Sequence, residues 1–116
     1  MVTGMKNVVV FVRDYDRAKE FYLERLKLPV VREAPPFMEF FPGGGPTLGV
    51  SLAMHEAAHP LVGRHTGITL QVAGIEEFCA GLAAAGITFA EPLEKTPWGK
   101  MAVVQDPDGN QFALVE

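Results

Sequence analysis

The three histidines of this sequence, His55, His59 and His65, together with Glu39, are the side chains best suited to bind a divalent metal ion. His55, Glu56 and His59 form the pattern H-E-x-x-H, which binds zinc in metalloproteases when both histidines share one face of an α-helix. Here the pattern follows a predicted strand, and Pro60 disfavours helical backbone at His59. The sequence therefore argues against a zinc protease.

A looser metal site could use His55, His65 and perhaps Glu39 in place of the protease pattern. If the flanking strands continue, His55 would point to the same face of its strand as Ser51, and His65 to the same face as Gly67. Imidazole and carboxylate are the donors that divalent ions prefer, so one bound metal ion and an enzymatic activity form an alternative hypothesis. The other interpretation is that these are solvated loop histidines.

Other chemistries and partners have little support in the composition. Gly43 to Gly45 precede Pro46 and a strand rather than a helix, so they do not form a phosphate loop, and no serine-hydrolase elbow is present. The net charge is −4 without a basic stripe, which argues against nucleic acid as a partner. No apolar run reaches the roughly 20 residues that span a bilayer. The lone Cys79 cannot form an internal disulfide, which favours a cytoplasmic location.

A tight hairpin is predicted at Asp106–Asn110. Pro107 presets the backbone for a turn, Asp106 and Asp108 can bond nearby N–H groups, and Gly109 supplies a positive φ. The short apolar runs on either side of this turn are typical of buried strands.

The periodicity of apolar residues predicts eight strands and two helices. The expected strands are Val8–Val12, Pro29–Glu33, Phe37–Phe41, Leu48–Met54, Ile68–Val72, Thr88–Leu93 and the two strands of the final hairpin, with helices near residues 15–27 and 75–85. Asp14 is the expected N-cap of the first helix, and Gly86 is expected to end the second.

The two halves of the chain repeat with an offset of about 60 residues. Val8, Val10 and Val12 align with Ile68, Leu70 and Val72. We therefore expect an α+β fold of two βαβββ modules, with mixed, curved sheets that form a cleft for a small molecule. The expected organisation is a single domain over residues 1–116, with module one at 6–54, a connector at 55–66 and module two at 67–116.

The pattern resembles the vicinal oxygen chelate superfamily, which holds glyoxalase I, extradiol dioxygenases, and fosfomycin and bleomycin resistance proteins. The residues that carry the resemblance are Val9–Ala18 with Phe21 and Tyr22, Phe40–Gly44, Ile68–Val72, Ala84–Ile87, Pro97–Gly99, and Asp106–Asn110 with Phe112 and Leu114. The resemblance is specific for the fold but not for the function, because the same scaffold carries many different activities.

The resemblance also implies four positions from which family enzymes bind a divalent metal. They correspond here to Asn7, to Gly49 or Ser51, to Gly67 and to Ala113. Glycine and alanine have no side-chain donor, so we expect the usual metal site to be absent and no cofactor to be bound.

The predicted ligand-binding residues are those of the strands that face away from the helices, together with the tryptophan of a hairpin. They are Asn7, Val9, Phe11, Ser51, Thr69, Gln71, Trp98, Gln111 and Ala113. The sequence does not decide which of Phe37, Met38, Phe40 and Phe41 point into the cleft. This wall is apolar and aromatic with a few amides and has no charged side chain, so salt is expected to matter little.

These expectations lead to one main hypothesis and two alternatives. The main hypothesis is a metal-free binding protein that sequesters an apolar or aromatic ligand, similar to bleomycin resistance proteins, as a homodimer. The alternatives are a glyoxalase- or dioxygenase-like enzyme with a displaced metal, and a non-catalytic interaction module.

Overall fold

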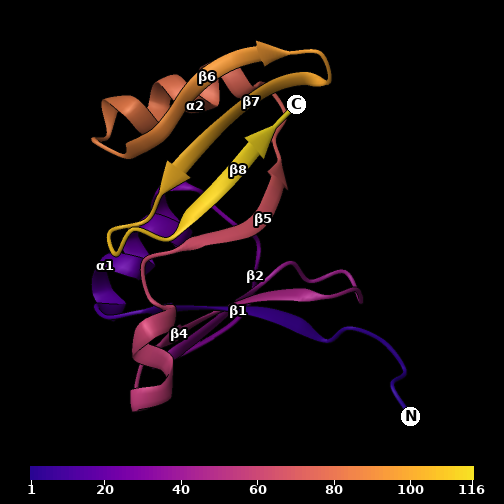
Figure 1. The fold of residues 1–116 in the computed structure, drawn as a ribbon, viewed down its shortest axis with the longest axis vertical. Helices are drawn as coiled ribbons and strands as arrows, with labels where there is room; N and C mark the ends of the chain where they lie inside the picture. The colour runs from indigo at the N-terminus through magenta and orange to yellow at the C-terminus, as the bar shows by residue number, and fades with distance from the viewer. The chain divides into compact units, whose positions relative to one another are not determined.

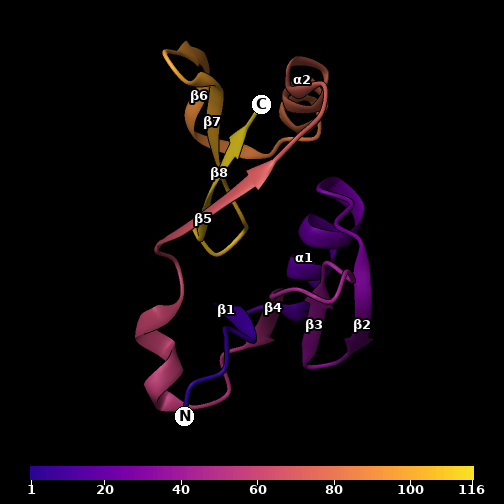
Figure 2. The same cartoon turned by 90° about the vertical axis from the view of Figure 1, so that its right-hand side faces the viewer.

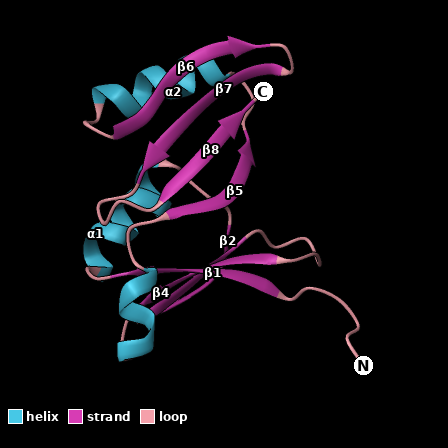
Figure 3. Ribbon diagram, viewed as in Figure 1, coloured by secondary structure: helices cyan, strands magenta, loops and turns pink.

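The computed structural model describes residues 1–116 and divides the chain into two units, Met1–Val62 and Gly63–Glu116. Each unit contains one four-stranded mixed sheet and one main helix (Figures 1 and 3). The two predicted βαβββ modules are confirmed.

The first unit has a sheet of strand order β1-β4-β3-β2, in which β1 and β4 are parallel and the other pairs are antiparallel. Its elements are β1 (Asn7–Val12), α1 (Tyr15–Lys19), the π-helical segment η1 (Glu20–Arg25), β2 (Val30–Ala34), β3 (Phe37–Phe40), β4 (Thr47–Leu52) and the 3-10 helix η2 (Glu56–Leu61).

The first helix begins where the sequence predicts. The Asp14 carboxylate accepts a hydrogen bond from the Arg17 N–H at 3.1 Å and so caps the first turn. Figure 2 shows α1 beside the sheet of its own unit. Tyr22 packs towards the sheet with its ring centroid 6.2 Å from that of Phe40. The buried core between helix and sheet consists of Val10, Val12, Ala18, Phe21, Tyr22, Leu26, Met38, Phe40, Leu48 and Val50.

The second unit repeats this plan with strand order β5-β8-β7-β6. Its elements are β5 (His65–Gln71), α2 (Ile75–Ala84), β6 (Thr88–Thr96), β7 (Gly99–Gln105) and β8 (Gln111–Val115). Helix α2 runs alongside β6 (Figure 1). The buried core consists of Ile75, Cys79, Leu82, Ala102, Val104, Phe112 and Leu114, with Val103 also buried.

The repeat is exact at the helix starts, since Tyr15 and Ile75 are 60 residues apart. The second helix ends with Gly86 at φ +84°, and the Ile87 N–H donates to the Leu82 carbonyl at 3.0 Å. Both predicted helices and the glycine stop are confirmed.

Most element boundaries differ by one or two residues from the sequence-based expectation, and the largest differences are at β5 and β6. The expected connector at 55–66 holds the 3-10 helix η2, and β5 already begins at His65. Gly67 has φ +74° and the pairing with β8 shifts between His65 and Ile68, so the start of this strand is irregular, and His65, Thr66 and Gly67 include no apolar side chain that would indicate a strand. Strand β6 extends to Thr96 rather than Leu93, through two similar shifts in its pairing with β7. None of the helices has both the length and the apolar character needed to cross a membrane.

Candidate functional site

Strand parity separates the two faces of the first sheet. On β1, Val10 and Val12 are buried on the side of α1, whereas Asn7, Val9 and Phe11 are half-buried and point to the opposite side. We call that opposite side the distal face. By strand pairing it carries Asn7, Val9, Phe11, Phe37, Glu39, Thr47, Gly49 and Ser51.

A glycine shapes the centre of the distal face. A Cβ on Gly49 would lie 2.9 Å from two ring carbons of Phe37 and 3.4 Å from a methyl carbon of Val9. The missing side chain therefore lets the Phe37 ring lie across β4. The sequence left open which side chains of strand β3 face this side. Phe37 does, while Met38 and Phe40 are fully buried beneath the helix.

A hydrogen-bonded ion pair borders this apolar centre. The Glu39 carboxylate accepts a hydrogen bond from the Thr47 hydroxyl at 2.6 Å through one oxygen and lies 3.3 Å from Arg32 Nε through the other. The Arg32 guanidinium carbon is 5.8 Å from the Phe37 ring centroid, within the range of a cation–π contact. The expectation of a face without charge was therefore wrong for the first sheet. Glu39 stands between the apolar residues Met38 and Phe40, and this alternation could have indicated that the glutamate points away from the core.

The second sheet places four of the predicted binding residues on one face, opposite α2. Thr69 pairs with Ala113, and Gln111 pairs with Gln105. Thr69 and Gln71 are exposed, and Gln111 and Ala113 are half-buried. Ser51, the remaining predicted strand residue, lies on the distal face of the first sheet and donates from Oγ to the Leu52 carbonyl at 3.2 Å.

Trp98 lies in the turn between β6 and β7 with 92% of its surface exposed. Its N–H donates to the Thr96 hydroxyl at 3.2 Å. Trp98 precedes the first residue of β7, whereas Gln111 pairs with Gln105, the last residue of β7, so the two lie at opposite ends of that strand. The second unit therefore does not gather Trp98 with Gln111.

Comparison with known families agrees with this architecture. A sequence model of the Glyoxalase/Bleomycin resistance protein/Dioxygenase superfamily matches residues 4–114. This chain belongs to that superfamily. Comparison with curated protein sequences found no match.

Several solved structures are similar to this chain over nearly its whole length. A superfamily member from Sphaerobacter thermophilus has 32% sequence identity and a TM-score of 0.80, with 99% of this chain and 98% of that chain covered. TnmS3, an antibiotic binding protein from Streptomyces sp. CB03234, has 26% identity and a TM-score of 0.79, with 98% and 95% covered. A glyoxalase/bleomycin resistance protein from the same source has 26% identity and a TM-score of 0.77, with 97% and 100% covered.

The residues at the superfamily's metal positions do not fit a divalent ion. Asn7 offers a neutral amide, the second position is either Gly49 with no side chain or Ser51 with a neutral hydroxyl, and Gly67 and Ala113 offer no side-chain donor. No three His, Cys, Asp or Glu side chains are grouped so that they could hold a metal ion. His55, His65 and Glu39, the alternative ligand set, therefore do not form such a group. Both carboxylate oxygens of Glu39 already have partners.

The H-E-x-x-H pattern also lacks the geometry of a zinc protease. His55 has extended backbone, with φ −109° and ψ 146°, and the residues after it form the 3-10 helix η2. A 3-10 helix has about three residues per turn, so residues four apart do not share a face.

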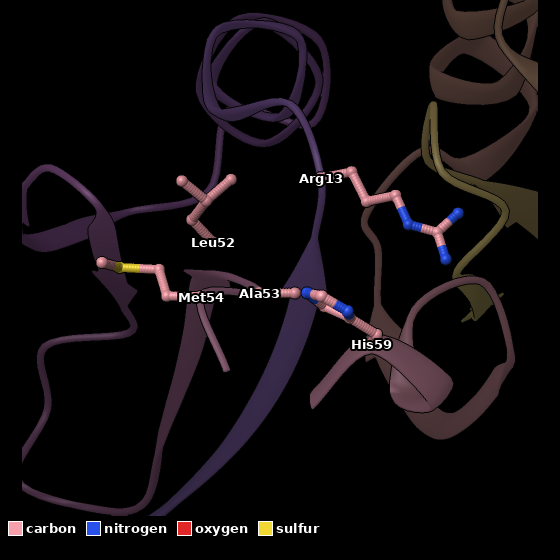
Figure 4. Close-up of a pocket in the computed structure, with 5 residues that line it drawn as sticks. All are labelled: Arg13, Leu52, Ala53, Met54 and His59. Carbon is pink, nitrogen blue, oxygen red and sulfur yellow. The ribbon is translucent and has the colours of Figure 1, made fainter. Parts of the chain in front are cut away.

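A pocket of about 510 Å³ that the sequence did not reveal lies in the first unit, after β1 and β4 (Figure 4). It is lined by Arg13, Leu52, Ala53, Met54 and His59. The Arg13 guanidinium points away from Leu52 and Met54 (Figure 4). This arrangement offers a partly apolar recess rather than a catalytic constellation.

Proposed function

We propose that this superfamily member is a metal-free binding protein that sequesters a flat, mainly apolar molecule against the distal face of its first sheet. The observation that carries the proposal is the position of the Phe37 ring, which lies against Gly49 where a side chain would otherwise stand, with Val9 on the other side of the same glycine, so that the centre of the distal face is apolar. Flat ligands bind such apolar surfaces by burial and stacking, at roughly 25 cal/mol per Å² of apolar area before association costs.

Two further observations support binding without chemistry. The positions that the family resemblance implies for a metal are Asn7, Gly49 or Ser51, Gly67 and Ala113, and none of them has the imidazole or carboxylate donor that the usual catalytic ion needs. One of the similar solved structures, at 26% identity, is described as an antibiotic binding protein. Sequestration requires affinity alone, and an apolar surface provides it.

The proposal includes the assembly and location expected from the sequence. We propose a homodimer, because one module cannot cover the apolar part of its own distal face. A cytoplasmic location is consistent with the lone, buried Cys79. A sedimentation mass of one chain at micromolar concentration would contradict the dimer.

A thermal-shift titration with naphthamide, a flat neutral probe, tests the binding function. Naphthamide should raise the melting temperature saturably, with a dissociation constant on the order of 10–100 µM for a ligand of this size. Phe37→Ala should weaken binding about tenfold because the stacking partner is lost. Phe78→Ala, a half-buried aromatic on α2, is the matched control and should bind like the wild type. No shift at millimolar naphthamide, or equal binding by Phe37→Ala, would contradict the function.

A further inference from the structure

We infer that the ligand carries a carboxylate and that Arg32 selects it; this inference rests on the binding function proposed above. The geometry points to a planar, mainly apolar acid whose ring system lies over Gly49 and Phe37 and whose carboxylate meets the Arg32 guanidinium. This inference is based on the polar residues at the border of the distal face, Arg32, Glu39 and Thr47, rather than on its apolar centre.

Glu39 is built to position Arg32 rather than to bind a ligand. Its side chain is only 13% exposed, and its two oxygens are engaged by the Thr47 hydroxyl at 2.6 Å and by Arg32 Nε at 3.3 Å. Thr47 thus holds the carboxylate from one side, and the carboxylate holds the guanidinium from the other. The Phe37 ring, 5.8 Å from the guanidinium carbon, gives a third point of contact.

Arg32 keeps donors available for a ligand in this arrangement. A guanidinium has five N–H donors in one plane, and the closest contact with Glu39 uses the Nε edge. The Arg32 side chain remains 67% exposed, which is far more than the exposure of its partner. A planar fork of donors matches the two oxygens of a carboxylate better than it matches a single neutral acceptor.

The strand pairing sets the size of the acid. Gly49 pairs with Glu39, and Glu39 pairs with Arg32, so Gly49 and Arg32 lie two strands apart in one row of the sheet. Two strand spacings correspond to about 10 Å. A bicyclic or tricyclic aromatic acid spans this distance, with its rings on the Gly49 side and its carboxylate at Arg32.

Naphthoate and naphthamide separate the charge preference from binding itself, because they share one shape and differ in charge. Calorimetric titration of the wild-type protein should show naphthoate binding about tenfold more tightly than naphthamide, as for a partly exposed charge-assisted hydrogen bond. Arg32→Gln should abolish this preference, so that the two compounds bind the variant with equal affinity, because only naphthoate loses a charged partner. Arg25→Gln removes an exposed arginine that pairs with Glu20 on η1, and it should change neither affinity.

The possible outcomes distinguish the two proposals. If naphthamide binds but naphthoate has no advantage, or if Arg32→Gln keeps the advantage, the carboxylate inference is wrong and the binding function stands. If neither compound binds below millimolar concentration, both proposals are wrong.

Discussion

The side-chain oxygen of Asn110 accepts a hydrogen bond from the Gly63 N–H at 2.9 Å, and this contact ties the β7–β8 turn to the first residue of the second unit. Asn110 is fully buried and donates from Nδ2 to Asp106 at 2.8 Å. Asp106 also accepts hydrogen bonds from the Asp108 and Asn110 N–H groups, each at 2.9 Å. The Asp106–Asn110 segment is therefore both a hairpin turn and an anchor for the chain that enters β5.

Asn110→Ala should destabilise the protein by about 2–3 kcal/mol, because the buried Asp106 carboxylate and the Gly63 N–H lose their hydrogen bonds to this buried side chain. Urea unfolding would measure the change. Gln111→Ala is the matched control, since this neighbouring amide is only half-buried, and it should cost less than about 1 kcal/mol. Equal costs for the two substitutions would show that the anchor is unimportant.

Gly63→Ala should also destabilise the protein. Gly63 has φ +79°, and a Cβ there would lie 2.6 Å from the backbone oxygen of Asp108. Because backbone must move, we expect a cost on the order of 1–3 kcal/mol in urea unfolding. Gly81→Ala is the contrasting case: it lies in α2 with nothing within 4 Å of the added carbon, and it should stabilise by about 0.5–1 kcal/mol. A neutral Gly63→Ala would contradict the predicted strain.

Gly49→Ala should separate binding from folding. The added Cβ would lie 2.9 Å from the far end of the Phe37 ring, so the ring must rotate away. We expect naphthamide affinity to fall several-fold, with a stability loss below about 1.5 kcal/mol because the ring is a movable side chain. Titration calorimetry and urea unfolding on the same variant test both parts. Unchanged affinity would mean that the Phe37 ring is not part of the binding surface.

Acid should weaken the second unit through Glu116. Its carboxylate accepts hydrogen bonds from the N–H groups of Ile75 and Gly74, both at 2.9 Å, and so caps α2, whose own N-cap residue has no side chain. These hydrogen bonds, the one from Ile75 first, lower the pKa of Glu116 below its ordinary value of 4.5. A lowered folded-state pKa gives stability that is present above pH 4.5 and is lost as pH falls through the folded-state value.

Comparing the wild type with Glu116→Gln tests this cap. At pH 7 the variant should melt at a lower temperature, and the difference should shrink as the pH falls below about 4.5. A difference in melting temperature that does not change between pH 7 and pH 3 would contradict the role of the carboxylate charge.

The fold was predictable because its local signals agree with one another. The Asp14 cap, the Gly86 stop and the 60-residue spacing of Tyr15 and Ile75 all follow from residue type and order, and the structure confirms them. The family resemblance supplied the arrangement of the strands into two sheets. The alternation on β1 also placed Val9 and Phe11 opposite the helix correctly.

The border of the site could not be predicted in the same way. The pairing of β2 with β3 shifts between Val30 and Arg32, and such a shift changes the face to which later residues point. Nothing in the local sequence marks this irregularity, so Arg32 was not assigned to the distal face. The approach of Phe37 to Gly49 depends on strand register, which sequence alternation does not define.

The central claim of metal-free binding is tested most directly by calorimetric titration of naphthamide into EDTA-treated and untreated protein. We predict one saturable site per chain, with a dissociation constant on the order of 10–100 µM that is the same in both samples. Loss of binding after EDTA treatment, or the absence of binding below millimolar concentration in both samples, would contradict the claim.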